Sequence, residues 1–124
     1  MCIRDRWSIT LFGGVPSHAV LKRPNKGDFR VQETHGGSVE LHPVPPPDLA
    51  DLAAAVLERA TSHLGLDSPL VQARVDLVRD LAGGPPKLME LELIEPELFL
   101  RARPGAAADL VAALVAALQR ASRS

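Results

Sequence analysis

Four side chains that could bind phosphate or a hard metal ion lie on two neighbouring stretches of the sequence. Arg74 and Asp76 alternate along the first stretch, and Glu90 and Glu92 alternate along the second. The Gly/Pro-rich loop between them is centred near Gly83 and predicts an antiparallel hairpin. In such a hairpin the numbers of opposed residues have a constant sum. Asp76 should therefore lie across from Glu90, and Arg74 across from Glu92, with all four on one face.

This grouping suits one kind of chemistry. Carboxylates that lie close together repel one another unless a cation sits among them. Magnesium binds one or two protein carboxylates and completes its octahedron with water and phosphate oxygens. Arg74 would then stabilise phosphoryl or oxyanion charge. The alternative is a solvated strand face with ordinary cross-strand ion pairs, which is a common pattern.

The elements that position these residues predict an α+β fold, in which helices pack on an antiparallel sheet. Alternating or β-rich segments predict strands, and apolar residues at helical spacing predict two helices. Asp48 is expected to cap the first helix and Gly65 to end it. Pro104 is expected near the start of the second helix, whose Leu/Val stripe is interpreted as core packing. The predicted strands are 8–12, 17–22, 38–41, 70–79 and 87–93, and the first helix is 48–64.

Composition narrows the classes of function. Aromatic residues make up 3% of the chain and the net charge is -1, so a base-stacking or backbone-binding nucleic-acid surface is not expected. No segment is long and apolar enough to predict a membrane span. The single cysteine, Cys2, excludes an internal disulfide, and a cytoplasmic protein is expected. The four histidines show no metal-ligand spacing and are interpreted as surface or loop residues.

The first six residues fit no strand or helix pattern. Residues 1–6 (MCIRDR) resemble a translated sequencing-adapter fragment, and a disordered natural tail is the alternative. The domain is therefore predicted to comprise residues 7–124. If residues 1–6 are foreign, Cys2 says nothing about the chemistry of the domain.

Three segments carry a resemblance to a known family. They are KGDFRVQ followed by HGG (residues 26–37), ARVD (residues 73–76) and LMELELIEP (residues 88–96). In this order and spacing they resemble ATP-grasp ligases, especially bacterial-type glutathione synthetases and ribosomal-protein-modifying glutamate ligases. The segment SHAVLKRP, with GDFRVQE, is also similar to the cycloserine-forming cyclo-ligase branch. The resemblance implies the C-terminal subdomain of an ATP-grasp fold, incomplete in this chain.

The resemblance also implies roles for the hairpin residues. Asp76 and Glu90 match the magnesium-binding carboxylates of the family. Glu92 stands where the family commonly has Asn, so it supplies an oxygen ligand with an added charge. Arg74 matches an arginine that contacts phosphate or the acyl-phosphate.

Further residues match less specific parts of the family pattern. Arg30 is expected near phosphate or a substrate carboxylate, although a surface ion pair is the commoner fate of an arginine. Gly36 and Gly37 match a substrate loop and could equally form a plain turn. Lys22 is expected near the nucleotide. Leu88 or Met89 could pack against adenine.

The implied activity is ATP-dependent joining of a small-molecule carboxylate to an amine or thiol through an acyl-phosphate. ATP and Mg²⁺, or Mn²⁺, are the expected cofactors. The missing N-terminal part of the enzyme would be the partner, and a homo-oligomer is possible in principle. The isolated chain is expected to be inactive, because the lysine-bearing nucleotide subdomain is not visible in it. The alternatives are a non-catalytic Mg-nucleotide-binding module and a structural α+β domain with a solvated acidic face.

Overall fold

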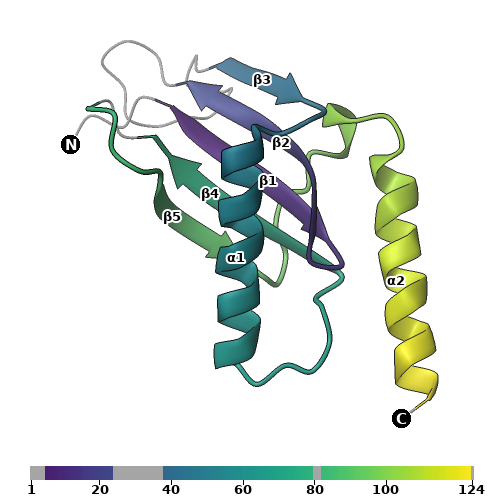
Figure 1. Cartoon of the computed structure of the whole chain (residues 1–124). Coiled ribbons are helices and arrows are strands. Elements are labelled where there is room, and N and C mark those ends of the chain that lie inside the picture. The colour runs from purple at the N-terminus through teal and green to yellow at the C-terminus, as the bar shows by residue number, and fades with distance from the viewer. Residues whose placement is uncertain (1–4, 24–37, 80–81, 124) are drawn as a thin grey trace.

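The computed structural model describes residues 5–23, 38–79 and 82–123. Five strands form one antiparallel sheet in the order β3-β2-β1-β4-β5, with helices beside it (Figure 1). The predicted α+β fold with an antiparallel sheet is therefore confirmed. The strands are β1 Arg6–Phe12, β2 Val15–Arg23, β3 Ser38–His42, β4 Gln72–Val78 and β5 Lys87–Glu92.

The turn between β1 and β2 depends on two glycines. Gly13 and Gly14 have φ angles of 59° and 83°. Side chains with a Cβ rarely adopt this left-handed region, which glycine enters without a steric cost. The glycine pair therefore closes the β1–β2 hairpin.

Alternation along the strands gives the sheet two unlike faces. On β1, Trp7, Ile9 and Leu11 point to one face, whereas Ser8 and Thr10 point to the other. The apolar face is covered by helix α1, Pro47–His63 (Figure 1). Its core consists of Trp7, Ile9, Leu11, Ala19, Leu21, Leu49, Ala53, Leu57, Ala73, Val75 and Leu77. The other face carries polar side chains such as Ser8 and Thr10, together with a small apolar cluster of Val20, Phe99 and Ala102.

The start of α1 differs from the prediction. Pro46 is the N-terminal cap residue and no side chain caps the helix, so the expected capping by Asp48 is wrong. The carboxylate of Asp48 instead accepts two hydrogen bonds from Arg79, at 2.7 and 3.0 Å. Proline suits the first helical position because it lacks an N–H group that would need a partner there. The expected role of Gly65 is confirmed, since it follows the helix with a φ of 71°.

The C-terminal region differs more from expectation. A 3-10 turn, η2 Leu100–Ala102, precedes helix α2, Ala106–Ser122, which lies beside the sheet (Figure 1). Among the described residues of α2 only Ala106 is buried. The interpretation of its apolar stripe as core packing is wrong, because the stripe residues are exposed: Val111, Leu114, Val115 and Leu118. Among the described residues, no helix has the length and apolarity needed to cross a membrane.

Candidate metal and phosphate site

The polar face brings the predicted hairpin residues together. The register pairs Arg74 with Glu92 and Asp76 with Glu90, which confirms the predicted pairing. On the other side of β4, Asp76 lies opposite Ser8 of β1. A bulge then shifts the β4–β5 pairing by one residue, so the simple hairpin rule holds only for the site itself.

Arg74 and Asp76 form the buried centre of the cluster. The Asp76 side chain is only 1% exposed, and that of Arg74 is 7% exposed. Arg74 Nε donates to Asp76 Oδ1 at 2.9 Å, and Nη2 donates to Oδ2 at 3.1 Å. The same guanidinium lies 3.2 Å from Glu92 Oε1. Glu92 is therefore held by Arg74 rather than beside Asp76.

Arg6 is a cluster member that sequence reasoning missed. Its Nε and Nη2 donate to Asp76 Oδ2 at 3.0 and 2.6 Å, and Nη2 also contacts Glu90 Oε2. The signal was present in the alternation of β1, which places Arg6 on the same face as Ser8. It was overlooked because residues 1–6 were set aside as foreign.

The charges of the cluster change its protonation. Burial alone would raise the pKa of Asp76, but hydrogen bonds and charge from Arg74, helped by Arg6, lower it below its usual range. Burial would lower the pKa of Arg74, yet Asp76 raises it overall. The pKa of Glu92 is raised, first by a hydrogen bond with Glu90 and then by burial, against the charge of Arg74. Asp76 and Arg74 are thus both ionised at neutral pH.

Lys22 lies beside this cluster, across the β1–β2 pair from Arg6. Its Nζ is 4.9 Å from the centroid of the Phe99 ring. Burial lowers the pKa of Lys22, and the charge of Asp76 opposes that change. Phe99 belongs to the segment before η2 and has a φ of 49°, which is unusual for a residue with a side chain. This segment extends over the polar face, because Thr10 donates to the carbonyl of Leu98 at 3.2 Å.

The oxygen donors suit a hard divalent cation. Asp76 and Glu90 are opposed carboxylates, and two such ligands are enough for magnesium in many proteins. Close by, the buried hydroxyl of Ser8 lies opposite Asp76 in the sheet and helps to lower the pKa of that carboxyl. Within the described ranges, however, no three His, Cys, Asp or Glu side chains are grouped to hold an ion. Asp76 and Glu90 are therefore the residues that would hold the ion, with Glu92 beside Glu90 and paired with Arg74.

The remaining predicted site residues are less informative. Leu88 and Met89 lie on the edge strand β5 and are 49% and 37% exposed, so a ligand could reach them. Arg30, Gly36 and Gly37 lie outside the described residues.

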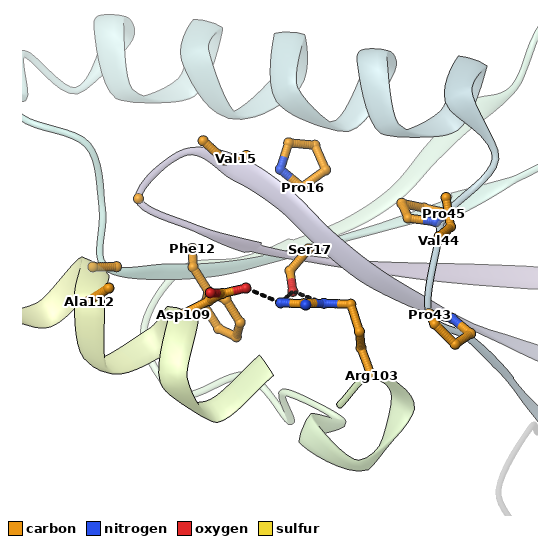
Figure 2. A pocket seen from close by; sticks show the side chains of 12 residues that line it. Phe12, Val15, Pro16, Ser17, Pro43, Val44, Pro45, Arg103, Asp109 and Ala112 are labelled. Atoms are coloured by element: carbon orange, nitrogen blue, oxygen red, sulfur yellow. Dashed lines mark hydrogen bonds and ion pairs between the residues drawn. The ribbon is translucent and has the colours of Figure 1, made fainter. Parts of the chain in front are cut away.

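A separate cavity of about 620 Å³ opens between the β1–β2 turn, the loop after β3 and helix α2 (Figure 2). Arg103 reaches into it, donating to Ser17 Oγ at 3.2 and 3.1 Å and pairing with Asp109. Most of its other lining residues are apolar: Phe12, Val15, Pro16, Pro43, Val44, Pro45, Ala112 and Ala113. None of the predicted site residues lines this cavity.

Comparison with known proteins gives this geometry a context. The cycloserine biosynthesis protein DcsG of Streptomyces lavendulae is 41% identical over 96 residues, which cover 74% of this chain and 30% of DcsG. The crystal structure of D-cycloserine synthetase DcsG matches 91% of this chain with a TM-score of 0.76 and 36% identity. This chain is homologous to DcsG over most of its length, and it shares its fold with ATP-grasp ligases.

Other solved structures share the fold. The D-alanine–D-alanine ligase of Bacillus anthracis, solved with ATP, matches 99% of the chain with a TM-score of 0.59 and 16% identity. The ATP-grasp ligase PsnB, solved with Mg and ADP, matches 93% with a TM-score of 0.58 and 13% identity. No protein-family model matches the chain. The chain spans 30% of the curated relative and 38% of the solved DcsG chain. The resemblance to ATP-grasp ligases is confirmed, including its cyclo-ligase branch.

Proposed function

We propose that residues 7–124 are the C-terminal portion of an ATP-grasp domain and that residues 1–6 are an adapter-derived or disordered tail. The parent enzyme would be an ATP-dependent ligase that joins a small-molecule carboxylate to an amine or thiol. In that reaction the γ-phosphoryl group of ATP passes to the carboxylate, releasing ADP. The nucleophile then attacks the carbonyl carbon, and phosphate leaves. Homology to DcsG over most of this chain supports the proposal.

One observation carries the assignment of this segment's role. Asp76, Glu90 and Arg74 converge on one face of the sheet. Asp76 and Glu90 would hold Mg²⁺ or Mn²⁺, with Glu92 near them. A divalent ion there would neutralise phosphate charge. The protein's part is chiefly to position groups and stabilise charge.

The cationic residues would serve the phosphates. Arg74 is fixed by two hydrogen bonds to Asp76, so its guanidinium stays oriented without further loss of side-chain entropy. Lys22 is partly buried on the same face and would add a second positive charge near the nucleotide. Arg30 with the Gly36–Gly37 loop would contact substrate, and Leu88 or Met89 would pack against adenine. A cytoplasmic enzyme that assembles from this portion and its N-terminal part completes the proposal.

A chimera tests the proposal. Residues 7–124 would replace the matching segment of S. lavendulae DcsG, and release of ADP and phosphate would be measured with the substrates of DcsG. We expect turnover in the chimera, and its loss on Asp76→Asn or Glu90→Gln. The matched control Asp48→Asn, which removes an exposed carboxylate from the other face, should retain turnover. A folded chimera that hydrolyses ATP equally well with Asp76→Asn would favour the alternative of a structural domain with an acidic face.

A non-catalytic Mg-nucleotide-binding module is the second candidate. The same carboxylates favour it, since they could bind Mg-ATP without turnover. The two candidates separate in the chimera, because binding of nucleotide without release of ADP is expected only from the binding module.

A further inference from the structure

Phe99 adopts a backbone conformation that normally belongs to glycine. Its φ and ψ are 49° and 48°, and in the described part of the chain no other residue except glycine has a positive φ. A side chain in this left-handed region costs free energy, so the conformation persists only where the surroundings fix it. Thr10 and His18 fix it here, because they donate to the carbonyl of Leu98 at 3.2 and 2.7 Å. Glycine would remove the strain, which indicates that the ring of Phe99 itself is needed.

The ring of Phe99 joins a small apolar cluster to a group of cations. It is 9% exposed and packs within that cluster on the polar face of the sheet. Lys22 Nζ lies 4.9 Å from the ring centroid, and Cζ of Arg101 and of Arg74 lies at 5.7 and 6.0 Å. The face of an aromatic ring attracts cations at such distances. Phe99 therefore gathers positive charge on the face that carries the proposed phosphate contacts.

Lys22 is the cation of this group that lacks an acceptor. Arg74 is bonded to both oxygens of Asp76, and Arg101 pairs with Glu97 at 4.0 Å. Within the described ranges, the ammonium group of Lys22 forms neither a hydrogen bond nor an ion pair, and it contacts the ring instead. An ammonium group carries three N–H donors, and leaving donors unpaired where water has only partial access costs free energy. An anion bound beside Lys22 would supply the missing acceptor.

We propose that Phe99 is a positioning residue, whose ring holds the ammonium group of Lys22 in place for one oxyanion of the reactants. The inference rests on the proposed ligase function and adds a residue to its site. The oxyanion is a phosphoryl oxygen of ATP or the carboxylate of the substrate, since both accept hydrogen bonds from an ammonium group. A ring orients Lys22 without using its N–H donors, which remain available to the ligand. A carboxylate in the place of the ring would instead pair with Lys22 and compete with the anion.

The surroundings of Lys22 agree with this role. Asp76 and Glu90 are near enough for their charges to act on the pKa of Lys22, which burial lowers. An anion bound by Lys22 would therefore lie beside the carboxylates that are proposed to hold the metal. The alternative is that Phe99 serves only to fill the apolar cluster. A leucine would serve that purpose too, but it would attract no cation, and this difference makes the inference testable.

The test is binding of tripolyphosphate and of citrate by the full 124-residue chain in the absence of divalent ions. The two probes carry phosphoryl and carboxylate oxygens, so the preferred probe shows which oxyanion the site takes. Binding is followed by two-dimensional NMR at the amide signals near Lys22, and the same spectra show whether each variant is folded. We expect Phe99→Leu, which removes the ring but keeps an apolar side chain, to weaken binding of the preferred probe about three- to tenfold. Phe99→Met serves as the second variant.

The controls separate positioning from packing and from net charge. Phe12→Leu removes another buried ring, which lines the separate cavity, and should bind as the wild type does. Arg120→Gln removes one positive charge at the end of α2 and should also leave binding nearly unchanged. Lys22→Gln should weaken binding at least as much as Phe99→Leu. In the Lys22→Gln background Phe99→Leu should have no further effect, because a positioning residue acts through the side chain that it positions.

The outcomes distinguish the inference from the proposed function. Weaker binding by Phe99→Leu that vanishes in the Lys22→Gln background supports the inference. Equal binding by wild type and Phe99→Leu, with weaker binding by Lys22→Gln, would keep the role of Lys22 and overturn that of Phe99. The same loss from Phe99→Leu with and without Lys22→Gln would make Phe99 a packing residue and overturn the inference. Binding unaffected by Lys22→Gln, or no binding of either probe, would also overturn it, while turnover of the chimera decides the ligase proposal separately.

Discussion

Asp76→Asn should destabilise the fold, although the side chains of Asp and Asn have nearly the same shape. The two oxygens of Asp76 accept hydrogen bonds from Arg74 at 2.9 and 3.1 Å and from Arg6 at 3.0 and 2.6 Å. Removing one partner of a buried ion pair costs about 3–5 kcal/mol, because the other charge is left buried without compensation. Glu92 still pairs with Arg74, and Arg6 is partly exposed. We therefore expect a loss at or just below the lower end of that range, about 2–3 kcal/mol.

Urea unfolding at pH 7, followed by the fluorescence of the buried Trp7, measures this loss. The matched control is Asp48→Asn, which removes a carboxylate from an exposed pair with Arg79. Its effect should be much smaller, since water screens exposed pairs. If Asp76→Asn lowered the free energy of unfolding no more than Asp48→Asn does, the buried cluster would not stabilise the fold.

The sign of the pH dependence gives a second readout of the same variant. The pKa of Asp76 is lower in the folded protein than its ordinary value of 3.8. Its contribution to stability is therefore fully present above that value and is lost as the pH falls through the folded pKa. The difference in stability between wild type and Asp76→Asn should shrink below pH 3.8. A difference that stayed constant into strong acid would contradict the assigned ion pairs.

Three further predictions test other parts of the fold. His18 is buried in β2, so its interpretation as a surface or loop residue is wrong. Burial lowers the pKa of His18, and its ring donates to the carbonyl of Leu98 at 2.7 Å, so wild-type stability should fall as the pH drops below 6.5. His18→Gln should flatten that part of the pH profile. Leu49 is fully buried, so Leu49→Ala should lower the free energy of unfolding by about 2–5 kcal/mol in chemical denaturation. Leu114→Ala on the exposed face of α2 should lower it by less than about 1 kcal/mol. Equal losses would contradict the burial pattern. Gly65→Ala should cost about 1–2 kcal/mol in thermal unfolding, because its φ of 71° is left-handed, and a neutral result would argue against this helix end.

The sheet and the register at the site could be predicted from the sequence because both depend on local patterns. Alternation within strands and the position of one loop determine which residues of a hairpin oppose each other. Asp76 and Glu90 were paired correctly for this reason. The bulge just after Asp76 was not predicted, since a single extra residue leaves no distinct signal in the pattern.

The missed features depend on contacts between distant segments. Periodicity identifies the apolar stripe of α2 but does not say whether anything covers it, so Leu114 and Leu118 proved exposed. The placement of Phe99 over Lys22 arises from an irregular segment with no period to read. Arg6 reached the acidic cluster because β1 extends two residues beyond the strand predicted from the sequence.

The central claim is that Asp76 and Glu90 form a divalent-cation site. Anomalous diffraction from crystals of the chain grown with Mn²⁺ tests it most directly. The account predicts a peak between the two carboxylates, within about 2.0–2.6 Å of an oxygen of each. Crystals that show Mn²⁺ only elsewhere, or no peak between the two carboxylates, would contradict it.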